Sequence, residues 1–426
     1  MESLKWEYHN EGNANMIFKD FDHKVTLRLR KVSGNQIDQF SSKKHSNSYS
    51  LEQEQKYKRE ILFCLCENTE YFHESKLVWL PQQFIEKNLT NSKIELQRPE
   101  YRRSKYIDTK PQFGLTMPFL GLFKCPEKLP SANFINVELK PKWGSLPLSK
   151  HVNPIKQVKC RFCLLQNLKT AKSLNGTTSK YCPLDLFGNC KCEVSHAMSS
   201  LLETPLNNLK LTVNGSFIET DSVTLNTTLS KQSLCEILTE IIHTDSKQGE
   251  NDNNENQLGD ERSLQTCSNS KFLQHQFHCI KQGDRGVLNL LRRLQQLDKY
   301  DIECIYGTYM DVLKESGFTT DDFLDFDSTL WTEFKTQVCT GRIPQQEFNV
   351  FDICQFLVAA TFKDCSIMIT FCEIERTFPS TSKHIIKSNN GKHYMYQIKL
   401  IDLDPRSILN MSYYYSLDQN ILSANI

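Results

Sequence analysis

The spacing of apolar residues along the chain predicts both strands and helices. Residues 25–31 alternate apolar and basic side chains with a period of two, which is typical of a strand with one buried face. Residues 6–18 predict two strands on either side of a polar turn that contains Gly12. Further apolar runs that predict strands occur at residues 78–81, 113–122, 134–139, 367–374 and 394–403. The fold class expected from this pattern is α+β.

Helical spacing of apolar residues recurs between these strands. The segments concerned are 57–67, 82–88, 156–168, 195–211, 287–317, 328–338 and 349–362. The last of them is nearly all apolar and is expected to be a buried helix. Two polar segments lack apolar periodicity, and we expect a mobile loop at 34–55 and a disordered insert at 245–263. Asn214-Gly215 predicts a hairpin turn between two short strands.

Length and composition set the scale of the fold. The 426 residues, with 39% hydrophobic content, can form a sizeable core, and we expect two lobes, at 1–122 and 123–426. The longest apolar stretch, 351–362, is interrupted by polar residues and is too short to cross a bilayer, so no membrane association is expected. Residues 1–12 are polar and predict no secretory signal. The cysteines are therefore expected to be mostly reduced thiols in the cytoplasm or nucleus.

Positive charge is concentrated between residues 140 and 172, a stretch without Asp or Glu in a chain of net charge +1. This concentration favours one focused anion site over a surface that binds polyanions everywhere. It begins with Lys140-Pro141-Lys142, directly after a predicted strand. Pro141 disfavours a helix, and side chains two residues apart in extended backbone leave the same face. Two such ammonium groups predict a multiply charged phosphate between them; the alternative is a solvated Lys-Pro-Lys turn.

Carboxylates occur at the ends of the last two predicted strands. Asp364 precedes the strand at 367–374, and Asp402 and Asp404 lie at the end of the strand at 394–403, its expected hairpin partner. Metal-assisted phosphoryl transfer needs one carboxylate to orient or deprotonate a hydroxyl and another to hold Mg²⁺. Aspartates at strand ends are more often turn formers. Their combination with a basic segment nevertheless favours the catalytic interpretation.

Two other patterns are compatible with ligands but have ordinary alternatives. The turn around Gly12 could cover nucleotide phosphates, with Arg28 reaching in from the next strand, or it could be a plain hairpin. A C-x-x-C pair followed by further sulfur and imidazole groups could hold a structural zinc ion or consist of buried free thiols. The residues concerned are Cys160, Cys163, Cys182, Cys190, Cys192 and His196.

Several sequence pieces together resemble the inositol-pentakisphosphate 2-kinase family. They occur in the family's order from one end of the chain to the other: WEYHNEGNANMIF, RPEYR, VELKPKWGSLP, CRFCLLQNLK, SKYCPLDLF, NNLKLTVNG, FKDCSIMI and LIDLDPRS. The resemblance implies a two-lobed fold distantly similar to protein kinases. It also implies transfer of the ATP γ-phosphate to the 2-hydroxyl of inositol 1,3,4,5,6-pentakisphosphate, which gives inositol hexakisphosphate (phytate).

The resemblance also implies roles for individual residues. Asp364 matches the catalytic aspartate, Lys140 lies nearer the transferred phosphate than Lys142, and Asp402 holds Mg²⁺ on the phosphates of ATP. The residues implied to bind the nucleotide are Glu11, Gly12, Asn13, Asn15, Arg28 and Asp402. The residues implied to bind the inositol phosphate are Arg102, Lys142, Arg161, Lys169, Asn207, Asn208, Ser366, Arg406 and Tyr414.

The chain departs from the family at three positions. Leu165 stands where the family commonly has His, Arg406 replaces a Lys, and Asn410 stands where some members have Arg. The expected partners are a small inositol phosphate, ATP and Mg²⁺, bound by a monomer that needs no nucleic acid. A non-catalytic inositol-phosphate scaffold is the alternative function. A nucleic-acid binder is disfavoured by the near-neutral net charge and by the lack of aromatic residues interleaved on the basic strand.

Overall fold

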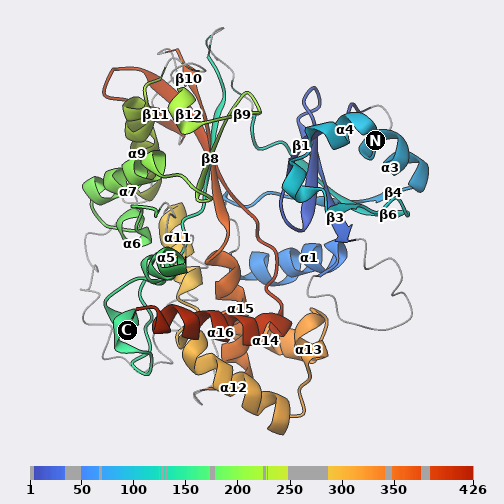
Figure 1. The fold of residues 1–426 in the computed structure, drawn as a ribbon, viewed down its shortest axis with the longest axis vertical. Coiled ribbons are helices and arrows are strands. Elements are labelled where there is room, and N and C mark those ends of the chain that lie inside the picture. Colours follow the sequence, from blue (N-terminus) through green and yellow to red (C-terminus); the bar gives the residue numbers. More distant parts are fainter. Residues whose placement is uncertain are drawn as a thin grey trace.

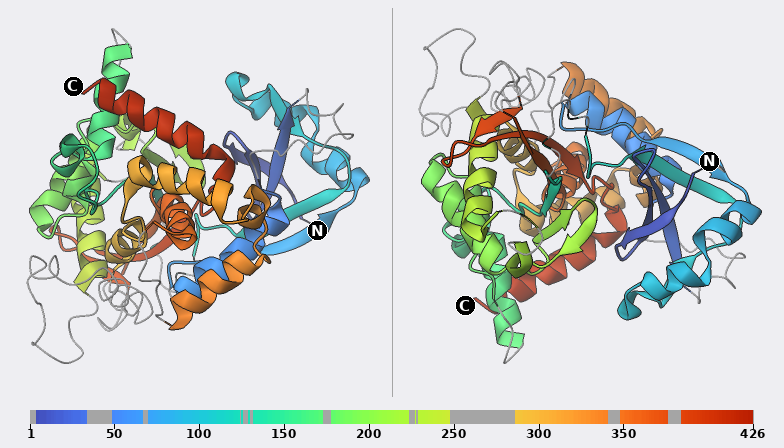
Figure 2. Two further views of the ribbon diagram at one scale, coloured as in Figure 1. Left: turned by 90° about the horizontal axis from the view of Figure 1, so that it is seen from below. Right: turned by 90° about the horizontal axis from the view of Figure 1, so that it is seen from above.

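The protein folds around two six-stranded antiparallel sheets (Figure 1). The computed structural model describes residues 4–33, 49–66, 70–123, 125, 129, 132–172, 178–223, 227, 229–247, 286–340, 348–375 and 384–425. Most helices gather around the second sheet, whereas the first sheet lies to one side of them (Figure 2). The expected α+β class is confirmed.

The N-terminal part of the chain forms the first sheet. Its strands are β1 (Glu7–Glu11), β2 (Asn15–Asp20), β3 (Val25–Ser33), β4 (Lys76–Leu80), β5 (Lys105–Ile107) and β6 (Gln112–Pro118). They are ordered β1-β2-β3-β6-β4, and β5 pairs with the end of β3. Phe18 and Leu27 of this sheet pack in one buried cluster with Ile85 of α3 (Gln82–Leu89) and Ile94 of α4 (Ser92–Gln97). This sheet therefore has a core of its own.

The second sheet combines strands from the middle and the end of the chain. Its strands are β7 (Ile135–Leu139), β8 (Leu209–Val213), β9 (Ser216–Ile218), β10 (Ser366–Ile374), β11 (Ile385–Lys387) and β12 (His393–Ile401), in the order β11-β12-β10-β7-β8-β9. Asn214 and Gly215, with φ of 48° and 79°, form the turn between β8 and β9, which confirms the predicted hairpin. Because β7 lies beside β10, the Lys140 segment meets residues more than 200 positions later in the chain.

Helices cover the second sheet and fill the C-terminal part of the molecule. They are η4 (Pro154–Gln157), α5 (Arg161–Lys172), α6 (Pro183–Leu186), α7 (Lys191–Glu203), η5 (Thr220–Ser222), α9 (Lys231–Lys247), α11 (Val287–Gln295), α12 (Asp301–Glu315), α13 (Thr320–Leu324), α14 (Thr329–Thr340), α15 (Val350–Phe362), η7 (Ile408–Asn410) and α16 (Met411–Ser423). The Asn349 side chain caps α15 by accepting the N–H of Phe351 at 2.8 Å. Nearly all of α15 is buried, as its apolar sequence predicts.

A continuous helical segment connects the two sheets. It consists of α1 (Leu51–Tyr57), the π-helix η2 (Lys58–Leu62) and α2 (Phe63–Leu65). Figure 1 shows α1 running between the first sheet and the C-terminal helices. The Tyr57 hydroxyl lies 3.2 Å from that of Thr361 on α15, while the Glu54 carboxylate pairs with Arg28 and Arg30 of β3. This segment therefore contacts both halves of the protein.

Several expected boundaries are wrong. Residues 51–55 belong to α1, where Ser50 and Gln53 form a capping box, so they are not part of a mobile loop. Residues 245–247 belong to α9; positions 34–48 and 248–263 lie outside the described residues. The helix expected at 195–211 ends at Glu203, because Pro205 follows. The helix expected at 287–317 is interrupted between α11 and α12.

Within the part of the chain that the structure describes, no helix is both long enough and apolar enough to cross a membrane.

Candidate active site

Two aspartates stand at one edge of the second sheet. β10 and β12 are antiparallel, and Ser366 pairs with Ile401. Asp364 lies just before β10 and Asp402 directly after β12, so antiparallel pairing brings both aspartates to the same edge. β7 also ends there, because Leu139 pairs with Ile367. The residues that follow β7 are therefore placed beside both carboxylates.

The Lys-Pro-Lys segment supplies a cation to each aspartate. Lys142 Nζ lies 2.9 Å from Asp364 Oδ1, and Lys140 Nζ lies 3.5 Å from Asp402 Oδ2. Arg406 Nη2 lies 2.7 Å from the second oxygen of Asp364. Ser366 Oγ donates a hydrogen bond to Asp402 Oδ2 at 3.2 Å. The structure thus brings together six residues that the sequence assigned to nucleotide, metal or substrate binding and to catalysis.

The charges at this edge shift the pKa values of Asp364 and Lys140. Burial alone would raise the pKa of Asp364, but Lys142 and Arg406 outweigh it and lower that pKa to about 2. Burial alone would lower the pKa of Lys140, but Asp402 and Asp364 outweigh it and raise that pKa. At neutral pH Asp364 is therefore negatively charged and Lys140 positively charged. Cations slightly outnumber carboxylates in it, which suits an anionic ligand.

Two residues of the cluster have unusual backbone conformations. Lys142 and Asp402 adopt left-handed φ values of 62° and 59°. Side chains larger than glycine adopt this region at a cost, and such strain is concentrated at functional sites. The side chain of buried Gln295 holds the Lys142 segment through three hydrogen bonds. Its Nε2 donates to the carbonyls of Lys142 at 2.8 Å and Phe362 at 3.0 Å, and its Oε1 accepts the N–H of Gly144 at 2.8 Å.

A second group of cations lies around Trp143. The Lys363 ammonium is 4.1 Å and the Arg161 guanidinium 5.0 Å from the centre of the Trp143 ring. Arg161 also pairs with buried Asp418 of α16. The Asp418 carboxylate accepts a further bond, of 2.7 Å, from Lys156. These contacts place Arg161 next to the Lys-Pro-Lys segment, as a common anion site requires.

The remaining predicted substrate residues are less tightly grouped. Tyr414 lies close enough to Arg406 and Asp364 for their charges to influence its pKa, which is raised chiefly by burial. Tyr414 lies in the first turn of α16, which begins at Met411, whereas Arg406 lies before that helix. Asn208 is buried, and its carbonyl accepts the N–H of Lys140 at 2.8 Å.

Three further predicted substrate residues are Lys169, Asn207 and Arg102. Lys169 and Asn207 are exposed. Arg102 lies on η3 (Glu100–Arg102), where its carbonyl accepts a bond from Arg98. Among the described contacts, none joins Arg102 to the Asp364 cluster.

A cavity of about 230 Å³ lies between the two sheets and reaches Asp402. Five of the residues predicted to bind the nucleotide line it: Glu11, Gly12, Asn15, Arg28 and Asp402. Asn13 is not among the lining residues; its carbonyl oxygens instead accept bonds from Lys105. Apolar and aromatic side chains make up much of the rest, including Ile17, Met117, Phe119, Met368 and Leu403. A largely apolar cleft with a few polar groups is typical of a small-molecule site.

Polar groups in this cavity are held by buried ion pairs. Arg28 bridges Glu54 of α1 and Asp404, whose Oδ1 lies 3.0 Å from Arg28 Nη1. Lys58 of η2 approaches the same Asp404 oxygen at 4.0 Å. Burial and, next, the charge of Arg28 lower the pKa of Lys58 to about 8. Glu11 pairs instead with Arg98 and Lys31, so its side chain is already engaged.

Several functional candidates were missed from the sequence. Lys58 and Gln295 belong to helices without a recognisable motif, and His9, His73 and the ion pair Glu138–Lys210 occur at ordinary strand and loop positions. Only tertiary contacts reveal these residues. The π-helix that carries Lys58 is a feature often found at functional sites, but no residue pattern announces it.

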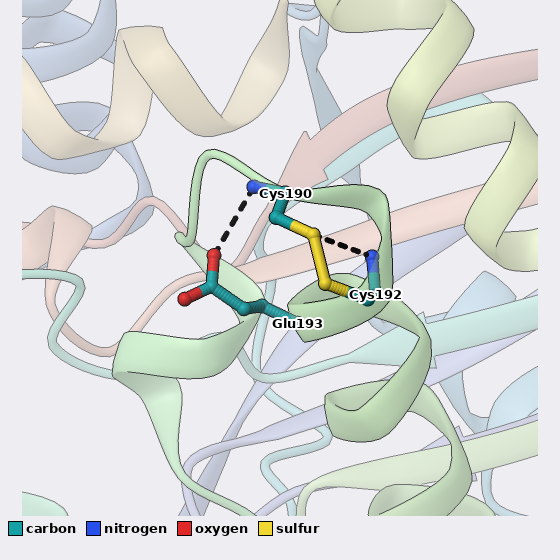
Figure 3. The surroundings of a disulfide bond; sticks show 3 residues. All are labelled: Cys190, Cys192 and Glu193. Carbon is teal, nitrogen blue, oxygen red and sulfur yellow. Dashed lines mark hydrogen bonds between the residues drawn. A yellow bond between two sulfur atoms is a disulfide. The ribbon is translucent and has the colours of Figure 1, made fainter.

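The expected cysteine constellation separates into two parts. Cys190 and Cys192 form a disulfide at the start of α7, beside Glu193 (Figure 3), so the expectation of reduced thiols is wrong for this pair. His196 pairs with Asp185 at 3.0 Å. Cys160, Cys163 and Cys182 remain together as free thiols, with their sulfur atoms within 4.8 Å of one another.

Comparison with known proteins shows the family of the chain. The sequence pattern of the family described as inositol-pentakisphosphate 2-kinase matches residues 8–420. The chain is 27% identical to an inositol-pentakisphosphate 2-kinase of Danio rerio over 99% of this chain and 93% of the relative. It is 28% identical to an inositol-pentakisphosphate 2-kinase of Arabidopsis thaliana over 87% of this chain and 76% of the relative. Because the match extends over nearly the whole chain, this protein belongs to the inositol-pentakisphosphate 2-kinase family.

Proposed function

We propose that this protein transfers the γ-phosphoryl group of ATP to the 2-hydroxyl of inositol 1,3,4,5,6-pentakisphosphate. Family membership supports the substrate class, since the relatives carry that activity in their names. The observation that carries the proposal is the pairing at the sheet edge, where Asp364 and Asp402 each contact a different lysine of Lys140-Pro141-Lys142. Two carboxylates with separate cations can serve two different phosphate groups.

The nucleotide is assigned to the cavity between the sheets, in a two-lobed arrangement like that of kinases. The first sheet is then the smaller lobe, and the strands β1 and β2 with Gly12 form its cover over the phosphates. His9 and His73 line the cavity, and burial lowers their pKa values to about 4 and about 3, so both are neutral at pH 7. The apolar end with these neutral rings suits adenine. Arg28, Lys58 and Asp402 form the polar end, which suits the phosphates.

Asp364 is assigned the general base. In the free protein its carboxylate is neutralised by Lys142 and Arg406, which keep its pKa far below that of a useful base. A substrate phosphate that draws these two cations away would remove the stabilisation and raise the pKa of Asp364. The base would thus become stronger only when the substrate is in place.

Asp402 is assigned to the metal. Its carboxylate is half-exposed at the mouth of the cavity and provides the oxygen ligand that Mg²⁺ prefers. Mg²⁺ bound there would neutralise charge on the ATP phosphates. Lys140, held 3.5 Å from Asp402, is placed to contact the phosphoryl group during transfer. Its raised pKa keeps it protonated for that role.

The inositol phosphates are assigned to the cations that surround Asp364. Lys142, Arg406 and Arg161 line this region, and Tyr414 lies beside them. A ligand with five phosphates needs cations from several segments, and these come from the β7 extension, α5 and the segment before α16. Lys169 and Asn207 are exposed and Arg102 lies on η3, and we assign these three residues to outer phosphates on the basis of the sequence resemblance alone.

The decisive experiment is a product analysis. Purified protein is incubated with ATP, Mg²⁺ and inositol pentakisphosphate, and the inositol phosphates are separated by anion-exchange chromatography. We expect conversion to inositol hexakisphosphate, and far less of it with the Asp364→Asn variant. Substrate binding without any product would identify the protein as a non-catalytic inositol-phosphate scaffold and overturn the proposal.

A further inference from the structure

Asn136 is a polar side chain in the largely apolar wall of the cavity between the two sheets. It is the second residue of β7, it is buried, and it lines the cavity together with Met117 and Met368. Thr212 of β8 and Thr370 of β10 lie directly opposite it in the two neighbouring strands. A buried amide needs hydrogen-bond partners, because an unmade bond is costly. The partners of Asn136 therefore indicate what this part of the wall can bind.

One atom of the Asn136 amide group has a partner and the other does not. The hydroxyl oxygen of Thr370 lies 2.8 Å from Asn136 Oδ1 and 2.6 Å from the main-chain carbonyl oxygen of Leu120. Asn136 Nδ2 has no hydrogen-bond partner among the residues that the structure describes. A hydroxyl carries a single proton, so Thr370 cannot donate to both oxygens. In this orientation of the amide, two acceptors face each other while a donor is unused.

The two contacts of Thr370 determine the orientation of the amide. The Leu120 carbonyl can only accept, so at 2.6 Å it must receive the proton of the Thr370 hydroxyl. The hydroxyl oxygen is then an acceptor and needs a donor from Asn136. Half a turn of the amide about its last bond exchanges oxygen and nitrogen, which have nearly the same shape. Nδ2 then donates to Thr370, and Oδ1 becomes the atom left for a ligand of the cavity.

We propose that Asn136 selects the base of the nucleotide by accepting, through Oδ1, a hydrogen bond from the exocyclic amine of adenine. The proposal rests on the proposed function, which assigns ATP to this cavity. Inosine and guanine nucleotides carry an oxygen on the ring carbon where adenine carries the amine. Two acceptors cannot form a hydrogen bond with each other, so Asn136 favours ATP over ITP and GTP.

The amide cannot turn back without loss to accommodate an oxygen on the base. In the reversed orientation Thr370 would have to give its proton to Asn136 Oδ1. The carbonyl of Leu120 would then lose its donor, and removing one partner of a hydrogen bond leaves the other with a penalty. Thr370 is therefore a positioning residue, whereas Asn136 contacts the base.

The position of Asn136 along β7 also suits the base. Lys140, which is assigned to the transferred phosphoryl group, follows four residues later on the same extended segment. Side chains four residues apart on a strand leave the same face. At ~3.3 Å per residue, the two positions are ~13 Å apart. An extended nucleotide can span this distance with its base at Asn136 and its terminal phosphate at Lys140.

The test is nucleotide binding by the full chain, measured by isothermal calorimetry with Mg²⁺ and without inositol phosphate. ATP is compared with ITP, in which an oxygen replaces the amine of adenine, and with N6,N6-dimethyl-ATP, which has no N–H donor there. We expect the wild-type protein to bind ATP at least ~10-fold more tightly than either analogue. Asn136→Ala should bind ATP and ITP with about equal affinity. A purely structural role of Asn136 would instead weaken both nucleotides by the same factor.

Variants of Thr370 test the orientation of the amide. Thr370→Ser keeps the hydroxyl and should keep the preference for ATP. Thr370→Val removes the hydroxyl, so the amide is free to turn, and the preference for ATP over ITP should fall. The exposed Asn390→Ala variant, outside the cavity, is the control and should keep the wild-type ratio of affinities.

The comparison of ATP with ITP on wild-type protein decides the matter even if the variants fail to fold. Equal affinities for the two nucleotides overturn the inference, and so does a preference for ATP that Asn136→Ala retains. Preferential binding of ATP without any inositol hexakisphosphate would uphold the inference while the kinase assignment fails. Conversion of the inositol phosphate by a protein that binds ATP and ITP equally would have the opposite meaning. A protein that binds no nucleotide would overturn both.

Discussion

The Gln295 side chain donates a hydrogen bond to the main-chain carbonyl of Lys142 at 2.8 Å. This contact supports a lysine whose backbone is left-handed, with φ of 62°. Because the same amide also bonds Gly144 and Phe362, it fixes the lysine segment relative to the end of α15, two residues before Asp364. The distance between Lys142 and Asp364 is therefore set by a residue of a third element.

We expect Gln295→Ala to lower kcat at least tenfold. A buried hydrogen bond whose partner is removed costs ~1–3 kcal/mol, and here three partners lose theirs. The backbone of Lys142 should relax toward an ordinary conformation, which would misplace its ammonium group. Steady-state kinetics check this, with the exposed Gln232→Ala variant on α9 as the control. Unchanged kcat in a folded variant would show that the lysine segment needs no such support.

Asp364→Asn should retain substrate binding but lose turnover by ~10²–10⁴-fold, because an amide cannot accept the hydroxyl proton. Single-turnover assays with excess enzyme measure the chemical step directly. Asp311→Asn, on the exposed side of α12, is the matched control. Activity within a few-fold of wild type would rule out Asp364 as the base.

Lys142→Ala should weaken binding of inositol pentakisphosphate more than binding of ATP. A charge-assisted hydrogen bond contributes ~1.5–3 kcal/mol, which corresponds to a loss of about ten- to a hundred-fold. Calorimetry at two salt concentrations checks this, since the difference should shrink as salt screens the charges. The exposed Lys150→Ala variant of the same basic stretch should have a much smaller effect. A loss of ATP affinity instead would move Lys142 to the nucleotide site.

Gly144→Ala should destabilise the protein by ~1–3 kcal/mol through overpacking. A Cβ at this position would lie 2.4 Å from the ring of Phe187, which is itself buried. Gly307, inside α12, offers the opposite case, because a Cβ there meets nothing within 4 Å. Gly307→Ala should stabilise the protein by ~0.5–1 kcal/mol. Urea unfolding of both variants decides the prediction, and equal effects would contradict it.

The sequence predicted the central part of the site because its geometry follows from strand pairing. Asp364 precedes β10 and Asp402 follows β12, so both lie at the same end of one antiparallel pair whenever the pairing is in register. The position of Lys140 follows from the pairing of β7 with β10. The alternation of apolar residues along β7 does not predict which strand it pairs with. Arg406, which lies before α16, reaches Asp364 from a loop whose course the sequence does not predict.

The supporting residues could not be predicted in the same way. Gln295 and Lys58 act through contacts with backbone and charges that are distant in sequence, and neither stands in a motif. Glu11 is a residue for which a role was expected but whose side chain is occupied by other contacts. The resemblance implies that it binds the nucleotide, yet its carboxylate is paired with Arg98 and Lys31. Burial of a charged group depends on its tertiary partners, which local patterns do not show.

Lys58 should make ATP affinity depend on pH above neutrality. Its folded pKa of about 8 is below the ordinary lysine value of 10.5, so it is charged at pH 7 and loses its proton as the pH rises through about 8. Since it lines the cavity beside Arg28, its charge should attract the ATP phosphates. Affinity should therefore be flat below pH 8 and fall above it. Calorimetry with Mg²⁺ and ATP at fixed ionic strength measures this.

The Lys58→Met variant should bind ATP more weakly at pH 7, and its ATP affinity should no longer fall above pH 8. The Lys58→Arg variant should keep its ATP affinity up to a higher pH. Lys56→Met, whose lysine pairs with Asp327 outside the cavity, should follow wild type. A fall above pH 8 that persists in Lys58→Met would assign the titration to another group.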